Sequence, residues 1–182
     1  MTSNHLLQPD LVLGGSILHL TPQLLQSQGL KGLILDVDDT LVPISATSVS
    51  QELQQWIAQI RPVVSLWLVS NNLNWVRIRS IAESLDLPFM MGAAKPSRRK
   101  LRQAVEQMAL PVEEVAMVGD RLFTDILAGN RLGMFTILVE PMENPGMHDR
   151  LFPVRSFEVW FSQALGACLT PSTENVTNLD KR

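Results

Sequence analysis

Three carboxylates stand within four positions of the stretch "GLILDVDDTLVP", which runs from residue 32 to residue 43. Asp36 and Asp38 alternate at the end of an apolar run, so in a strand their side chains project to the same side. Like charges that close raise one another's pKa unless a cation compensates, and a hard divalent cation such as Mg²⁺ is the simplest one. An Asp-rich turn is the alternative for this segment taken alone. An EF-hand calcium loop is excluded, because Leu41 and Thr47 occupy its glycine and glutamate positions.

Further polar side chains occur where later apolar runs end. The run "SLWLVSNN" ends in Ser70 and Asn71, "GAAKPSRRK" contains Lys95, and "EVAMVGDRLFTD" ends in Asp120 with Asp125 soon after. Each of them alone has an ordinary alternative, namely a helix cap, a solvated surface charge or a turn residue. Their succession favours a single site that combines carboxylates, a hydroxyl and an ammonium group.

The elements that must position these residues follow from hydrophobic periodicity. Strands are predicted at residues 30–37, 63–70, 88–92, 115–119 and 135–140, and helices at residues 50–60, 74–85, 97–109 and 122–132. Ser50 and Ser97 are expected to be N-caps, and Gly133 is expected to end the last helix. This alternation predicts the α/β class, as a doubly wound, Rossmann-like parallel sheet with helices on both faces. In such sheets ligands bind at the carboxyl ends of the strands.

We expect three segments along the chain. Residues 1–29 are predicted to form an N-terminal helical segment packed on the core, with an amphipathic membrane-contact element as the alternative. Residues 30–168 form the main domain. Residues 169–182, which end in the polar run "TPSTENVTNLDKR", are predicted to be a disordered tail.

Composition limits the classes of function. The chain has 182 residues, of which 46% are hydrophobic and 18% charged, so a folded core is expected rather than general disorder. The net charge of −3 gives no overall attraction to nucleic acid, and no nucleic-acid partner is predicted. Cys168 is the only cysteine, which excludes an internal disulfide. With no signal peptide and no membrane span recognised, we expect a cytoplasmic protein, with peripheral membrane attachment left open.

The motifs together resemble those of a known enzyme family. "DVDDT", Ser70, Lys95 and "GDRLFTD" are similar to the four motifs of the haloacid dehalogenase (HAD) superfamily of phosphohydrolases. The resemblance implies that Asp36 is a nucleophile that forms an aspartyl-phosphate. It also implies that Asp38 protonates the leaving alcohol and then activates water.

The same resemblance implies the binding residues. Mg²⁺ would be held by Asp36, the backbone carbonyl of Asp38 and Asp120, while Asp125 would ligate the metal or orient its waters. The phosphoryl group would be bound by Ser70 and Lys95, with Asn71 and Thr40 as supporting residues.

A closer resemblance concerns one branch of this superfamily. "LTPQLL", "GLKGLILDVDDTLVP", "AAKPSRR" and above all "GDRLFTDILAGNRLG" are similar to the YqeG-type branch of HAD subfamily IIIA, which is related to phosphatidylglycerophosphate phosphatases. Asp39 departs from the Asn expected there, and whether it binds anything stays open. The segments between motifs are too short for a cap domain of roughly 50 residues. An open site suits a phosphate on a large substrate, such as an anionic phospholipid at a membrane surface.

Several alternatives remain beside this interpretation. The substrate could be a small soluble phosphomonoester, or the fold could be a catalytically silent interaction module. A phosphoaccepting receiver domain fits less well, because its lysine would follow the last acidic strand. A basic cluster at the start of the third predicted helix indicates an anion in front of it or simply a solvated face; it contains Arg98, Arg99, Lys100 and Arg102, and Arg77, Arg79 and Arg121 could enlarge it. His148 is expected to be a surface residue, and no role is predicted beyond Pro141.

Overall fold

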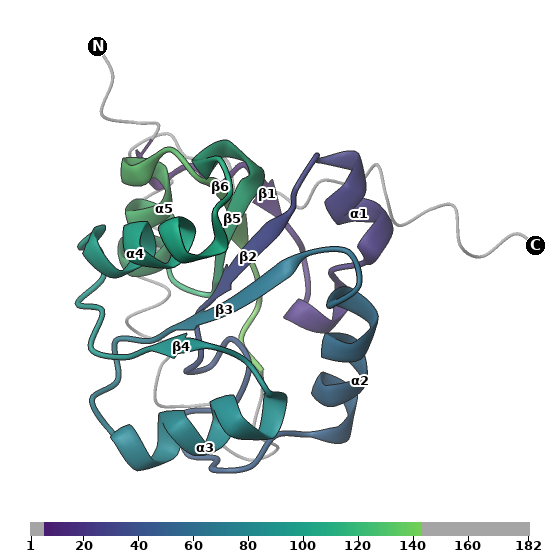
Figure 1. The fold of residues 1–182 in the computed structure, drawn as a ribbon, viewed down its shortest axis with the longest axis vertical. Helices are drawn as coiled ribbons and strands as arrows, with labels where there is room; N and C mark the ends of the chain where they lie inside the picture. The colour runs from purple at the N-terminus through teal and green to yellow at the C-terminus, as the bar shows by residue number, and fades with distance from the viewer. Residues whose placement is uncertain (1–5, 143–182) are drawn as a thin grey trace, which may run out of the picture.

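A computed structural model describes residues 6–142, which fold around one parallel six-stranded sheet (Figure 1). The strand order is β1-β6-β5-β2-β3-β4. In chain order the strands are β1 (Leu11–Val12), β2 (Gly32–Leu35), β3 (Ser65–Val69), β4 (Phe89–Met90), β5 (Val115–Gly119) and β6 (Phe135–Leu138).

Helices connect the strands. Before β2 lie the single 3₁₀ turn η2 (Ile17–His19) and α1 (Pro22–Ser27), and the later helices are α2 (Gln51–Ile60), α3 (Trp75–Leu85), α4 (Arg99–Met108) and α5 (Leu127–Leu132). Two short turns complete the set, η3 (Val112–Glu114) and the π-helical η4 (Leu122–Ile126), which leads directly into α5.

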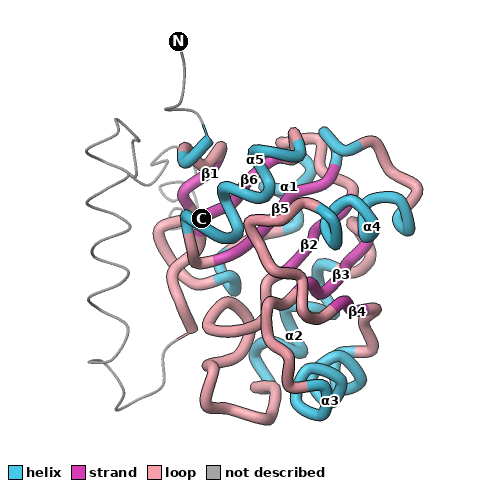
Figure 2. The backbone as a smooth tube through the Cα atoms, turned by 90° about the vertical axis from the view of Figure 1, so that its left-hand side faces the viewer, coloured by secondary structure: helices cyan, strands magenta, loops and turns pink. Residues whose placement is uncertain are grey.

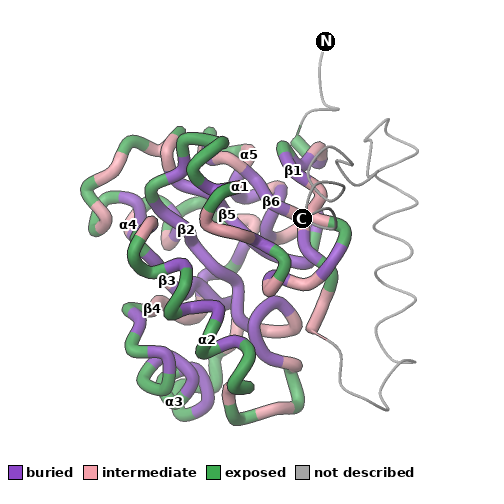
Figure 3. Tube along the Cα trace, turned by 90° about the vertical axis from the view of Figure 1, so that its right-hand side faces the viewer, coloured by how far each residue is buried: buried purple, intermediate pink, exposed green. Residues whose placement is uncertain are grey.

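The sheet separates two hydrophobic cores. Alternate side chains of β2 divide between them: Leu33 and Leu35 pack with α1, α2 and α3, whereas Ile34 packs with α4 and α5. This is the division that opposite faces of a strand require. Figure 3 shows buried residues along the central strands and exposed residues on the helices around them. The prediction of a doubly wound parallel sheet with helices on both faces is therefore confirmed.

The predicted elements are present, most of them with trimmed ends, and three details differ. The cap of α4 was predicted wrongly, because Arg98 rather than Ser97 is its N-cap, and the Ser97 hydroxyl instead accepts a 3.4 Å hydrogen bond from the backbone N–H of Arg99. The helix predicted at residues 122–132 is divided between η4 and α5. The N-terminal segment contains the expected short helices, but it also adds β1, which pairs with β6 through Leu11 and Ile137.

Within residues 6–142 nothing covers the carboxyl edge of the sheet as a separate domain. Between Thr40 and Ser70 the chain forms α2 and then β3. Between Ser70 and Lys95 it forms α3 and β4. No helix of this described part is long and apolar enough to cross a membrane. The proposed domain boundary at residue 168, the tail at residues 169–182, Cys168 and His148 lie outside the described residues.

Candidate active site

The site residues lie where four neighbouring strands end. Asp36 follows β2, Ser70 follows β3, Lys95 follows β4 by a short loop, and Asp120 follows β5. Register aligns these ends, because Leu35 of β2 pairs with Leu68 of β3 and with Val118 of β5. Figure 2 views the molecule on the side where the connecting loops gather between α3 and α4. The sheet thus brings together residues that are up to 89 positions apart in sequence, from Asp36 to Asp125.

A buried lysine lies at the centre of this group. The Nζ of Lys95 is 2.5 Å from Oδ1 of Asp36 and 2.7 Å from Oδ1 of Asp125. It also donates a 3.0 Å hydrogen bond to the carbonyl of Val69. The side chains of Lys95 and Asp125 are each 1% exposed, so the ammonium is fixed among carboxylates away from bulk solvent.

Three acidic residues of the group could hold a metal ion. Asp36, Asp120 and Asp125 each offer one carboxylate oxygen, and these oxygens all lie within 4.8 Å of one another. All three residues are buried, and the nearby Lys95 supplies one positive charge against three carboxylates. A set of buried oxygen donors with excess negative charge is the chemistry that Mg²⁺ prefers. The residues present therefore fit the expected Mg²⁺.

Thr40 and Gly119 position two of these carboxylates. The Thr40 hydroxyl donates to Oδ1 of Asp120 and accepts from the Asp120 backbone N–H, both at 3.2 Å. Asp125 packs against Gly119, where a Cβ atom would lie 2.4 Å from the Asp125 Cγ. Asp125 can therefore reach the cluster only because residue 119, at the end of β5, has no side chain.

Burial changes the protonation of the central pair. Burial raises the pKa of Asp36 to about 7; Lys95 opposes this rise, and the negative charges of Asp125 and Asp38 add to it. Burial by itself lowers the pKa of Lys95, but Asp125 and Asp36 together outweigh burial and raise it. Lys95 is consequently a cation at neutral pH, whereas the Asp36 carboxyl group is only partly ionised there.

Asp38 occupies a different environment from Asp36. Its Oδ1 accepts a hydrogen bond from Nη1 of Arg77 at 2.5 Å, and its Oδ2 accepts from Nδ2 of Asn72 at 3.1 Å and from the Ser70 hydroxyl at 3.3 Å. Charged and neutral donors thus hold this carboxylate on the side of β3 and α3. The two aspartates of the "DVD" motif are in this way separated into a buried site beside Lys95 and a half-buried site beside Arg77.

Arg77 belongs to the site, whereas the sequence suggested that it extends a basic surface patch. That suggestion is wrong, because Arg77 is only 8% exposed. Its Nε donates to the carbonyl of Ala46 at 2.9 Å and its Nη2 to the carbonyl of Pro43 at 3.1 Å. A signal existed in the sequence: Arg77 precedes the buried Ile81 by four residues, which places it on the inner face of α3.

The side chains of Asn71 and Asp39 form hydrogen bonds with backbone groups. The Asn71 side chain accepts from the Lys95 N–H at 2.7 Å and donates to the Lys95 carbonyl at 3.2 Å, so it fixes the backbone that carries the lysine. Asp39 has a φ of +62° and accepts a 2.9 Å hydrogen bond from the N–H of Ile44. Asn and Asp are the residues most tolerant of this left-handed conformation, which fits the Asn expected there. A direct contribution of Asn71 to phosphate binding stays a prediction.

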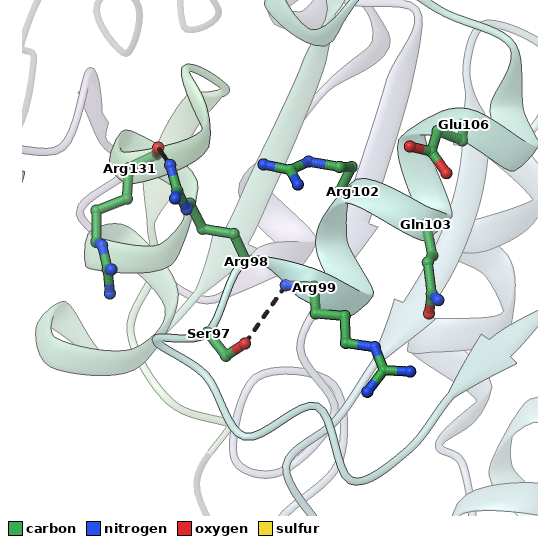
Figure 4. A pocket seen from close by; sticks show the side chains of 7 residues that line it. All are labelled: Ser97, Arg98, Arg99, Arg102, Gln103, Glu106 and Arg131. Atoms are coloured by element: carbon green, nitrogen blue, oxygen red, sulfur yellow. Dashed lines mark hydrogen bonds between the residues drawn. The ribbon is translucent and has the colours of Figure 1, made fainter.

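The basic cluster of α4 surrounds a separate hollow. Arg98, Arg99 and Arg102 line it together with Arg131 of α5, which the sequence did not indicate, and its volume is about 690 Å³ (Figure 4). Arg98 donates to the carbonyl of Arg131, and Arg131 donates to the carbonyl of Pro96. None of the predicted catalytic, phosphate-binding or metal-binding residues lines this hollow.

Comparisons with known proteins identify the family of the chain. A HAD-hydrolase-like family model matches residues 92–141. The chain is 38% identical over 128 residues to the probable phosphatase YqeG of Bacillus subtilis, covering 70% of this chain and 74% of YqeG. It is 30% identical over 151 residues to the chloroplastic phosphatidylglycerophosphate phosphatase 1 of Chlamydomonas reinhardtii, covering 78% of this chain and 54% of that protein. A predicted HAD-like family hydrolase from Porphyromonas gingivalis shares the fold, with a TM-score of 0.52 and 13% identity over 70% of this chain and 96% of that one.

Proposed function

Because this chain belongs to the HAD-type phosphatases, in the branch that contains YqeG, we propose that it dephosphorylates phosphatidylglycerophosphate to phosphatidylglycerol with Mg²⁺ as cofactor. The observation that carries the chemistry is the buried Asp36 beside Lys95, Asp120 and Asp125. A carboxylate in that position is close to a fixed cation and to two further metal-ligating groups. This is the arrangement that phosphoryl transfer needs for positioning and charge stabilisation.

The reaction proceeds in two steps, formation and hydrolysis of an aspartyl-phosphate. In the first, a carboxylate oxygen of Asp36 attacks phosphorus, the bond from phosphorus to the substrate's alcohol oxygen breaks, and Asp38 gives that oxygen a proton. In the second, water attacks the aspartyl-phosphate, its proton passes to Asp38, and the bond between phosphorus and Asp36 breaks to release phosphate. The two groups stand in different surroundings, since Asp36 is buried beside Lys95 whereas Asp38 is hydrogen-bonded at a half-buried position.

The remaining residues bind and orient. Lys95 carries a positive charge beside Asp36, and the same charge would face the oxygens of a phosphoryl group that Asp36 attacks. Ser70 and the backbone N–H of Asn71 are further donors for the phosphoryl group. When bound, Mg²⁺ supplies positive charge that lowers the cost of charge developing on the transferred group. Asp36, the backbone carbonyl of Asp38, Asp120 and Asp125 would hold it.

The choice of a phospholipid rests on two observations. The Chlamydomonas relative is named for phosphatidylglycerophosphate, and this chain spans about half of its length. In addition, the described segments after β2 and β3 are too short to form a cap domain over the site. An open edge can accept a headgroup that is still attached to a bilayer. A small soluble phosphomonoester is the second candidate, and a silent interaction module is disfavoured because Asp36, Lys95 and Asp120 are all present.

A pair of matched variants tests the catalytic assignment. Asp36→Asn removes the nucleophile and should abolish Mg²⁺-dependent phosphate release. Asp39→Asn makes the same chemical change three residues away, outside the buried cluster, and should keep most of the activity. Circular dichroism and thermal unfolding establish that both variants fold. Unchanged turnover by Asp36→Asn would refute the mechanism.

A substrate panel tests the lipid assignment. Initial rates of phosphate release are compared between phosphatidylglycerophosphate in mixed micelles and a set of soluble phosphomonoesters, each with Mg²⁺ and with EDTA. The lipid should give the highest kcat/KM. A soluble compound with an equal or higher value would overturn the choice of lipid while leaving the phosphatase chemistry intact.

A further inference from the structure

Four large apolar side chains are exposed together near the candidate active site. Leu73 is 80% exposed, Val76 75%, Ile44 53% and Trp75 52%. They account for four of the five exposed large hydrophobic residues in the described part of the chain. Isolated exposed apolar residues are ordinary, but a group of them at one place indicates an interaction site. We call these four residues the apolar rim.

The apolar rim is next in sequence to residues that are hydrogen-bonded to the catalytic Asp38. Leu73, Trp75 and Val76 surround the start of α3, between Asn72 and Arg77, which both bind Asp38. Arg77 also binds the carbonyls of Pro43 and Ala46, and so holds the loop that carries Ile44 against α3. The rim therefore lies at the same sheet edge as the site.

The Trp75 ring has two neighbours, an aromatic ring and a guanidinium group. Its ring lies 5.4 Å from the Phe89 ring, and the Arg79 guanidinium lies 5.9 Å from the Trp75 ring centre. A tryptophan with an apolar body and a neighbouring arginine is typical of side chains that sit at the boundary between lipid headgroups and acyl chains. This supports a contact with a bilayer rather than with water alone.

Positive charge flanks the same edge on the other side. The first turn of α4 presents Arg99 and Arg102, which with Arg98 and Arg131 line the hollow in Figure 4. Both α3 and α4 begin at the carboxyl edge of the parallel sheet, and in Figure 2 they flank the loops of that edge. The net charge of the chain is −3, so the positive charge of these arginines is opposite in sign to the net charge of the protein. Anionic lipid headgroups are complementary to such a group.

We propose that the apolar rim and the arginines of the α4 hollow dock the protein onto an anionic lipid bilayer, with the active site facing the membrane. The proposal deepens the proposed function and rests on it, because docking is useful when the substrate phosphate belongs to a membrane lipid. A bilayer is a better occupant than a protein partner, because anionic headgroups are complementary to the arginines that flank the apolar rim.

Vesicle flotation of the full chain tests the docking surface directly. The wild type should float with vesicles of phosphatidylcholine mixed with phosphatidylglycerol, and much less with pure phosphatidylcholine. Leu73→Ser combined with Val76→Ser changes the two most exposed rim residues and should weaken partitioning roughly tenfold or more. Arg99→Gln combined with Arg102→Gln should remove the preference for the anionic vesicles and the sensitivity to salt.

Controls separate a lost surface from a lost fold. Leu6→Ser removes the fifth exposed apolar side chain, which lies beside α5, and should leave flotation unchanged. Trp75→Ala provides a second rim variant whose unfolding temperature is measured beside the serine pair. Equal flotation of the wild type and the Leu73→Ser/Val76→Ser variant would overturn the proposal, as would equal loss with Leu6→Ser.

Kinetics distinguish this proposal from the proposed function. The Leu73→Ser/Val76→Ser variant should lose turnover of phosphatidylglycerophosphate in vesicles but keep the wild-type turnover of the same lipid as detergent-dispersed monomers. If the wild type hydrolyses no phosphatidylglycerophosphate in either form, the substrate assignment fails, while flotation still decides on the docking surface. If the variant loses both turnovers equally although it is folded, the rim belongs to catalysis and the docking proposal is wrong.

Discussion

Proton competition at Asp36 should make Mg²⁺ binding strongly pH-dependent near neutrality. Burial raises the pKa of this carboxyl to about 7 in the metal-free protein, whereas an ordinary aspartate titrates near 3.8. A carboxyl must lose its proton before it can serve as a metal ligand, so protons and Mg²⁺ compete for the same group. The perturbation is a change of pH from 8 to 6 at constant ionic strength.

The size of the effect follows from the fraction of Asp36 that is ionised. With a pKa of about 7, about nine tenths of the group is ionised at pH 8 and about one tenth at pH 6. The Kd for Mg²⁺ should therefore be about tenfold weaker at pH 6, a difference of about 1.4 kcal/mol. At pH 7 each binding event should release about half a proton, because about half of the sites then carry one. An aspartate with an ordinary pKa would show almost no change over this range.

Isothermal titration calorimetry measures both quantities. Titrations at pH 6, 7 and 8 give the Kd, and repetition at pH 7 in buffers with different ionisation enthalpies counts the released protons. The Asp39→Asn variant is the matched control and should retain the full pH dependence, since Asp39 bonds to the N–H of Ile44 outside the cluster. A Kd that is the same at pH 6 and pH 8, with no proton release, would refute the assignment of Asp36 as a raised-pKa ligand.

Two further predictions concern residues that position the site. Arg77→Met should lower kcat roughly a hundredfold or more by releasing Asp38, while Arg77→Lys should restore part of the lost kcat. Equal losses of kcat in the two variants, with equal losses of stability, would indicate a purely structural role for Arg77. Gly119→Ala should destabilise the fold by about 1–3 kcal/mol in urea denaturation and weaken Mg²⁺ binding, because the new Cβ would lie 2.4 Å from the Asp125 Cγ. Unchanged urea stability and Mg²⁺ affinity in that variant would contradict the close approach.

The strands of the sheet were predictable where a continuous apolar run marks them in the sequence. The β2 run is buried along its whole length, and β5 has the predicted limits. β1 was missed because Leu11 and Val12 precede the alternation of strands and helices and become a strand only by pairing with β6, whereas the equally short β4 falls within that alternation. Ser97 has the side chain of an N-cap, yet the helix starts one residue later, since caps depend on backbone geometry that residue type alone does not fix.

Side-chain partners were less predictable than the elements that carry them. Arg77 has the periodicity of a buried residue, but charge made a surface position the simpler expectation. Its burial is tolerated because Asp38 and two carbonyls satisfy its donors. Arg131 joins the hollow from α5, more than 30 positions after Arg98, which no local pattern can indicate.

The sequence by itself determined the chemical types and their order: acids after β2 and β5, a hydroxyl after β3 and a lysine after β4. It could do so because residue type and strand periodicity are local properties. The tertiary structure decided which charges meet. Lys95 pairs with Asp36 and Asp125, while Arg77 pairs with Asp38, because strand register and the packing of α3 set the distances between them. Those distances, together with burial, also decided that Asp36 rather than a solvent-exposed carboxylate has the raised pKa.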